Sequence, residues 1–72
     1  MGIDYKQIIR DEITRIETKN NYLMDKLKNS DSMGQKYLYD REINVNNFNL
    51  ICLYELLSKI EKREREYEED EK

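Results

Sequence analysis

The side chains able to do covalent or metal chemistry are one cysteine and a set of carboxylates. Cys52 is the only cysteine in the 72 residues, and histidine is absent. A thiol becomes a nucleophile or redox group when a nearby base or cation lowers its pKa, but Cys52 lies within an apolar run, residues 50–54. We therefore expect Cys52 to be buried as a small hydrophobic residue. A single cysteine also excludes an internal disulfide.

The carboxylates best placed to meet on helices are Asp11, Glu61, Glu64 and Glu68. Dimetal sites in helical bundles add Glu-x-x-His motifs, and structural zinc sites use cysteine and histidine sets. Histidine is also the most frequent general base and the usual partner of a catalytic nucleophile. A chain without histidine is therefore expected to bind no metal or cofactor, to have no small-molecule substrate and to be no enzyme.

A basic and aromatic group occupies the middle of the chain, where Tyr22, Tyr37 and Tyr39 alternate with lysine and arginine. Cations beside aromatic rings are typical of surfaces that bind nucleic acid. This patch makes a nucleic-acid-binding regulator the alternative function. Its basic members are Lys26, Lys28, Lys36 and Arg41.

The first element that must position these groups is a helix over about residues 5–28. Asp4 can cap its start, and Gln7 stands three positions later, as in a capping box. The following seam residues are separated by alternating steps of four and three, which is the a/d spacing of a helix that packs along one stripe. These seam residues are Ile9, Ile13, Ile16, Asn20, Leu23 and Leu27.

A second helix is expected from Met33 to about residue 69. Residues 29–32 form a polar turn cluster, and Ser32 with Gln35 makes a second capping box. The same a/d spacing then continues through Tyr39 to Tyr67. Four asparagines within residues 44–49 compete with helix formation, so the alternative is three helices over about 5–28, 33–43 and 48–69.

A short turn between two helices predicts an antiparallel, all-α hairpin. A turn centred near residue 31 places Asn20 near Ile43 and Ile16 near Asn46. We expect Asn20 and Asn46 to lie at the edge of the seam in contact with water, and the alternative is a buried asparagine that fixes register.

A hairpin has no third layer to cover the apolar side chains of residues 50–57. We therefore expect a homodimer that forms a four-helix bundle, with a groove on a host protein as the alternative partner. Small dimeric helical hairpins that bind RNA share this general architecture. The expected interface residues are Leu50, Leu53, Tyr54, Leu57, Ile60, Ile13 and Ile16.

Charge divides the chain into a hairpin core, residues 1–60, and an acidic extension, residues 61–72. The extension holds seven of the 16 acidic and four of the 13 basic side chains, so it carries the whole net charge of −3. We expect it to solubilise the chain and to steer it toward a basic partner. The acidic tail residues are Glu66, Glu68, Glu69, Asp70 and Glu71.

The longest apolar run, residues 50–54, is too short to span a bilayer, and no secretory signal precedes the first helix. The expected location is the cytoplasm. Abundant isoleucine, lysine, asparagine and tyrosine indicate A/T-rich codons and favour a phage, a mobile element or an AT-rich bacterium as the source. We expect a small, non-catalytic regulator or inhibitor that binds another protein, with a structural subunit of a larger assembly as a further alternative.

Overall fold

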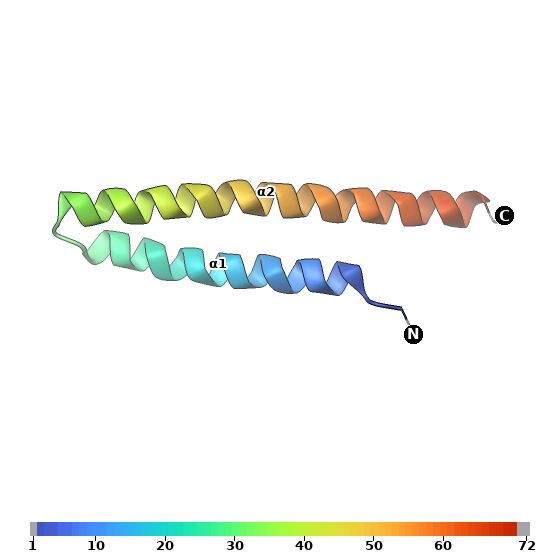
Figure 1. Cartoon of the computed structure of the whole chain (residues 1–72), viewed down its shortest axis with the longest axis horizontal. Helices are drawn as coiled ribbons and strands as arrows, with labels where there is room; N and C mark the ends of the chain where they lie inside the picture. The colour runs from blue at the N-terminus through green and yellow to red at the C-terminus, as the bar shows by residue number, and fades with distance from the viewer. Residues whose placement is uncertain (1, 71–72) are drawn as a thin grey trace.

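Two α-helices make up all the regular structure of the residues that are placed. The computed structural model describes the backbone of residues 2–70 and the side chains of residues 2–67. Helix α1 spans Tyr5–Asn29 and helix α2 spans Met33–Asp70. They lie side by side and antiparallel, and α2 extends past the start of α1 at the end where both termini lie (Figure 1). The predicted all-α hairpin is confirmed.

Both helices begin at the capping residues that the sequence predicts. The Asp4 carboxylate accepts a 3.1 Å hydrogen bond from the backbone N–H of Gln7. The Ser32 hydroxyl accepts one of 3.4 Å from the backbone N–H of Gln35. Each bond satisfies a donor that the first turn of a helix leaves without a partner. The side chain of Gln7 donates instead to Asp11, at 2.9 Å, so the first cap is one-sided.

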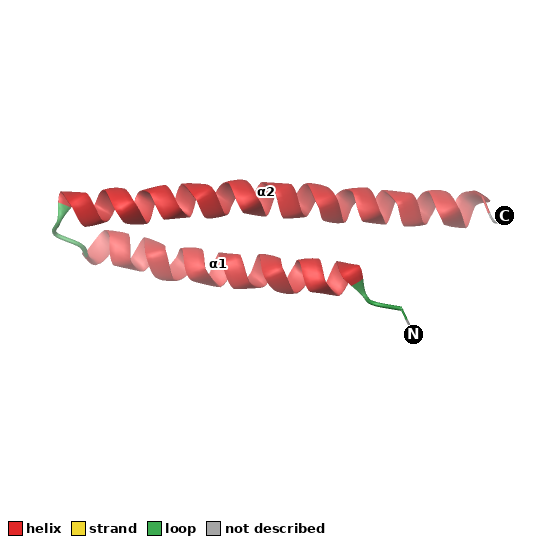
Figure 2. Ribbon diagram, in the orientation of Figure 1, coloured by secondary structure: helices red, strands yellow, loops and turns green. Residues whose placement is uncertain are grey.

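Helix α2 runs without a break through the asparagine-rich segment 44–49 (Figure 2). The three-helix alternative is therefore wrong. Asparagine disfavours a helix when its amide bonds to nearby backbone. Here Asn46 and Asn47 bond instead to a side chain of α1, and the Asn44 amide donates to Asp40 at 3.4 Å. These three amides thus have partners that leave the helical backbone bonds intact.

The buried core is a single seam between the two helices. At its narrowest the Cα trace is 13 Å deep, against a length of 61 Å, so the molecule is about one helix thick. The α2 leucines of the seam are only half-buried, and the core is open along both edges. The buried apolar residues are Ile9, Ile13, Ile16, Leu23 and Ile43.

The register differs from the predicted one by about one helical turn. The amide of Asn20 bonds to Asn46 and Asn47, whereas the sequence places Ile43 opposite it. The three-residue linker, residues 30–32, begins with an extended Ser30 (φ −87°, ψ 133°). It carries the start of α2 beyond the end of α1 (Figure 1). Because of this offset, Asn20 faces a residue of α2 that comes about three positions later in the sequence than the symmetric turn predicted.

Candidate interaction surfaces

The centre of the seam holds a side-chain amide cluster. Asn20 is 6% exposed. Its Oδ1 accepts a 2.9 Å hydrogen bond from Nδ2 of Asn46, and its Nδ2 donates a 2.9 Å bond to Oδ1 of Asn47. The expectation that Asn20 lies at a wet edge is therefore wrong, because the offset register buries it. Its buried polar atoms are satisfied, which removes most of the cost of burying them.

Three ion pairs also join the two helices, one beside the amide cluster and two toward the open end of the hairpin. Their side chains are 31% to 52% exposed, so water and salt screen them and each adds little stability. The outermost pair brings residue 64 of α2 into contact with α1. The sequence placed the end of the hairpin core earlier, at residue 60. The pairs are Lys19–Glu42 at 3.2 Å, Arg10–Glu61 at 3.4 Å and Lys6–Glu64 at 2.9 Å.

Two of the contacts between the helices shift the pKa of their donors. The Tyr54 hydroxyl donates to Glu17 Oε1 at 3.1 Å, and this hydrogen bond raises the pKa of Tyr54. The hydrogen bond and the charge of Glu64 raise the pKa of Lys6. Both contacts favour the protonated donor. Their contribution to stability is therefore present at neutral pH and is lost as the pH rises past the ordinary values of these groups.

The residues predicted to form a partner interface lie mostly inside the hairpin. Ile13 and Ile16 are buried in the seam. The α2 residues among them are half-buried against α1, except Tyr54, which is 50% exposed. Whether the half-buried edges also contact a second chain stays a prediction. The half-buried residues are Leu50, Leu53, Leu57 and Ile60.

A second apolar surface lies on the face of α2 that points away from α1. Val45 and Phe48 each lie two residues from a seam position, a rotation of about 200° around the helix. Cys52 lies at the edge of this face, where it lines a groove together with residues of α1. Phe48 is 67% exposed, and Cys52 is exposed, so the predicted burial of the thiol is wrong. We call this surface the outer stripe. It consists of Leu38, Arg41, Val45, Phe48, Cys52 and Leu56.

The sequence also contains a signal for the outer stripe, separate from the a/d pattern of the seam. Leu38, Arg41, Val45, Phe48 and Cys52 are themselves separated by steps of three, four, three and four. This is a second a/d pattern on the same helix. The first pattern contains more leucine and isoleucine, and it accounts for the seam. The second therefore marks a face of α2 that the hairpin leaves uncovered.

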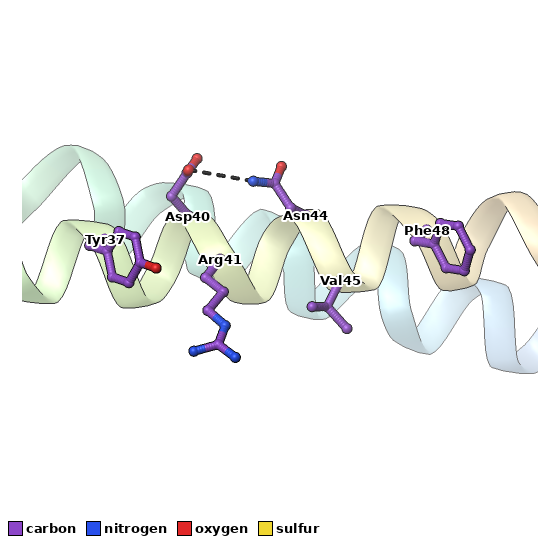
Figure 3. A pocket seen from close by; sticks show the side chains of 6 residues that line it. All are labelled: Tyr37, Asp40, Arg41, Asn44, Val45 and Phe48. Atoms are coloured by element: carbon purple, nitrogen blue, oxygen red, sulfur yellow. Dashed lines mark hydrogen bonds between the residues drawn. The ribbon is translucent and has the colours of Figure 1, made fainter.

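Two open grooves lie on α2, one along its outer face and one beside the seam residue Ile60. The first, of about 420 Å³, has both aromatic and charged walls, and α1 lies behind α2 when the groove faces the viewer (Figure 3). It is lined by Tyr37, Asp40, Arg41, Asn44, Val45 and Phe48. The second, of about 260 Å³, is nearer the C-terminus. It is lined by Leu56, Lys59, Ile60 and Arg63.

The predicted basic patch is divided among different faces. Lys26 and Lys28 are two positions apart on α1 and so point in different directions. The Lys26 ammonium lies 5.4 Å from the centre of the Tyr22 ring, whereas Lys28 lines a hollow beside Leu27. Arg41 belongs to the outer groove of α2. Lys36, the fourth member, is half-buried. The described residues form no single basic face, and nucleic-acid binding stays a prediction.

The acidic extension is described only in part. Helix α2 continues to Asp70, and Glu66 is exposed. The side chains of Glu68, Glu69 and Asp70, and the whole of Glu71, lie outside the described residues. Within the described part of the chain, no cluster of three carboxylate or thiol groups is placed to hold a metal ion. No helix there combines the length and apolar character that crossing a membrane requires.

The outer stripe and its grooves are thus apolar features that the hairpin leaves uncovered among its described residues. Comparisons with protein families, with curated proteins and with solved structures return no match to this chain.

Proposed function

We propose that the chain is a non-catalytic protein-interaction module that docks through the outer stripe of α2. The observation that carries this proposal is the exposure of its large apolar members: Phe48 67%, Leu38 59%, Val45 53% and Leu56 46%. Monomeric proteins seldom expose contiguous apolar patches larger than roughly a few hundred Å² unless the patch is functional. Apolar residues at this spacing are the anchors by which helices dock on protein surfaces.

The composition of the stripe also suits a protein partner. Tyr37 and Arg41 border Phe48 in the first groove, and tyrosine and arginine are enriched among the residues that dominate binding energy. A chain held this way acts sterically, by covering part of its partner, as a regulator or inhibitor. The A/T-rich composition favours a phage or mobile-element origin, and the acidic extension favours partners with a basic rim.

Capture from a cell lysate by immobilised chains tests the proposed surface. The full-length chain is compared with Phe48→Asp, which places a charge at the centre of the outer stripe. Met24→Asp is the matched control, because Met24 is an exposed apolar residue of α1. We expect specific proteins, or the chain itself, to be retained by the wild type and Met24→Asp and lost with Phe48→Asp. Equal retention by all three would contradict docking through the stripe.

The open seam supports a second function, that of a structural subunit. Even Leu23, the most buried residue of the described core, is 4% exposed, so the hairpin has a thin core for a chain of this size. A subunit that gains its stability from an assembly should be largely unfolded alone. Far-ultraviolet circular dichroism of the dilute chain separates the two functions, because an independently folded module is highly helical.

A further inference from the structure

We propose that the outer stripe is occupied by a second copy of this chain, with the two α2 helices antiparallel and Phe48 of each copy meeting at a two-fold axis. This inference rests on the proposed function, because it names the partner of the same surface. A two-fold arrangement is the commonest symmetry of small oligomers, and it requires the surface to be complementary to itself. The charges along the outer stripe meet that requirement in one particular register.

The charged residues one heptad before and one heptad after Phe48 are complementary about it. Arg41 precedes Phe48 by seven residues and Glu55 follows it by seven. Both are exposed, and neither makes an ion pair with any described residue. In an antiparallel pair of helices centred on Phe48, Arg41 of one copy faces Glu55 of the other, and the symmetry forms this pair twice. Opposite charges across a contact fix register and orientation.

Other arrangements of the same two helices bring like charges together. A parallel, in-register pair stacks Arg41 on its own copy and Glu55 on its own copy. An antiparallel pair displaced so that Phe48 faces Cys52 sets Arg41 against Lys59. Like charges across such a contact are unfavourable. The charge pattern therefore selects the arrangement in which Phe48 faces Phe48.

The apolar residues closest to Phe48 fit the same register. Val45 of one copy then faces the segment 51–52 of the other, which contains Ile51 and Cys52. Leu56 faces Asp40 and Arg41 of the other copy, at the wall of the groove that begins at Tyr37. The central contact is a pair of phenylalanine rings, which bury large areas and prefer offset or edge-to-face packing. The dimer covers the outer stripe and leaves the seam and its amide cluster unchanged.

Measuring the mass of the protein in solution tests whether the outer stripe is the dimer interface. We expect the wild type to sediment as a dimer whose dissociation constant rises at least about 30-fold in Phe48→Asp, as for a central interface residue. Helicity should be unchanged, because Phe48 lies outside the seam. Met24→Asp should remain dimeric. Arg41→Glu and Glu55→Arg should each weaken the dimer, and the double variant should restore it.

Disulfide formation tests the orientation. In the proposed dimer the two Cys52 residues are offset by eight positions, about 12 Å along the helices, and a disulfide requires Cα atoms within about 7 Å. Wild-type chains should therefore stay reduced in a glutathione redox buffer. Phe48→Cys combined with Cys52→Ser should link rapidly, and Val45→Cys should link through the native Cys52 of the other copy. Met24→Cys with Cys52→Ser is the control for random collision.

Several results would overturn the inference. A wild-type dimer that Phe48→Asp leaves intact would place the interface elsewhere, and a rapid Cys52–Cys52 disulfide would show a different register or orientation. A wild-type chain that is monomeric at all concentrations would exclude the second copy as the occupant. If the monomeric wild type captures a protein from the lysate and the Phe48→Asp variant does not, the proposed function stands with another partner. If the monomeric wild type and the Phe48→Asp variant capture the same proteins, both proposals fail.

Discussion

Asn46 of α2 donates a 2.9 Å hydrogen bond to the Oδ1 of Asn20, the only polar residue among the described side chains that is buried. Asn47 accepts from the same Asn20 amide. Because both bonds cross between the helices, they are satisfied in one axial register only. A slide by one turn would break both of these bonds, and a buried amide left without partners costs about 1–3 kcal/mol. The cluster therefore specifies how the hairpin closes.

We predict that Asn20→Leu raises the thermal midpoint while loosening the register. Leucine adds apolar burial in the seam, and the freed amides of Asn46 and Asn47 can reach water, because these residues are half-buried and exposed. A polar seam residue lowers stability in exchange for specificity. Thermal unfolding followed by circular dichroism measures the first effect. Distances between spin labels on the two helices, which should broaden, measure the second.

Asn20→Asp is the matched variant of similar size. It places a carboxylate in the seam and removes the donor to Asn47, so we expect a loss of at least about 1–3 kcal/mol in unfolding free energy at neutral pH. If Asn20→Leu is less stable than the wild type and Asn20→Asp is not, the amide cluster has been assigned the wrong role.

Leu23→Ala should unfold much of the protein. Leu23 is 4% exposed, the lowest value among the core residues, and truncation of a buried leucine costs about 2–5 kcal/mol. That is a large share of the stability of a chain this short. Its neighbour provides the control. Met24 is 54% exposed, and Met24→Ala should change the unfolding free energy by no more than about 0.5 kcal/mol. Urea titration of both variants measures the difference.

Tyr54 should titrate above the ordinary tyrosine value. Its hydroxyl donates to Glu17, and this bond raises the pKa of Tyr54. A raised pKa in the folded state means that the contact stabilises below pH 10, the ordinary value, and is lost as the pH rises through the folded value. The difference in ultraviolet absorbance between the wild type and Tyr54→Phe isolates this group from the other five tyrosines.

Removing the acceptor provides the check on that titration. In Glu17→Gln the midpoint of the difference curve should fall back toward pH 10, because the neutral amide no longer favours the protonated phenol. Glu12→Gln is the matched control, since Glu12 pairs with Arg15 and not with Tyr54. If the titration midpoint of Tyr54 is the same in Glu17→Gln as in the wild type, the hydrogen bond between Tyr54 and Glu17 does not form in solution.

Charge exchange between Lys6 and Glu64 should report the register directly. Each single reversal, Lys6→Glu or Glu64→Lys, places like charges at a contact that is 2.9 Å long in the wild type. Both should lower the thermal midpoint slightly, and the double reversal should restore it. Added salt should weaken all three effects, because the side chains are solvent-exposed. Lys6→Glu combined with Glu66→Lys should give no rescue, since residues 64 and 66 point in different directions on a helix.

Much of the local structure follows from short-range rules. Asp4 and Ser32 mark the two helix starts because their side chains cap the first turn. The seam positions follow from the a/d spacing, and the absence of proline allows α2 to be long. The interpretation of residues 44–49 needed tertiary information, because an asparagine favours or breaks a helix according to where its amide finds a partner.

The sequence by itself determined that this chain forms two capped helices, that they are antiparallel, and which residues share each face. Only the tertiary structure decided the axial offset of the helices, and with it the burial of Asn20. Periodicity fixes the rotation of residues around one helix, but the offset between two helices depends on the path of the linker and the fit of side chains across the seam. Helix α2 carries two apolar stripes, and packing against α1 determined which one, the outer stripe, was left uncovered.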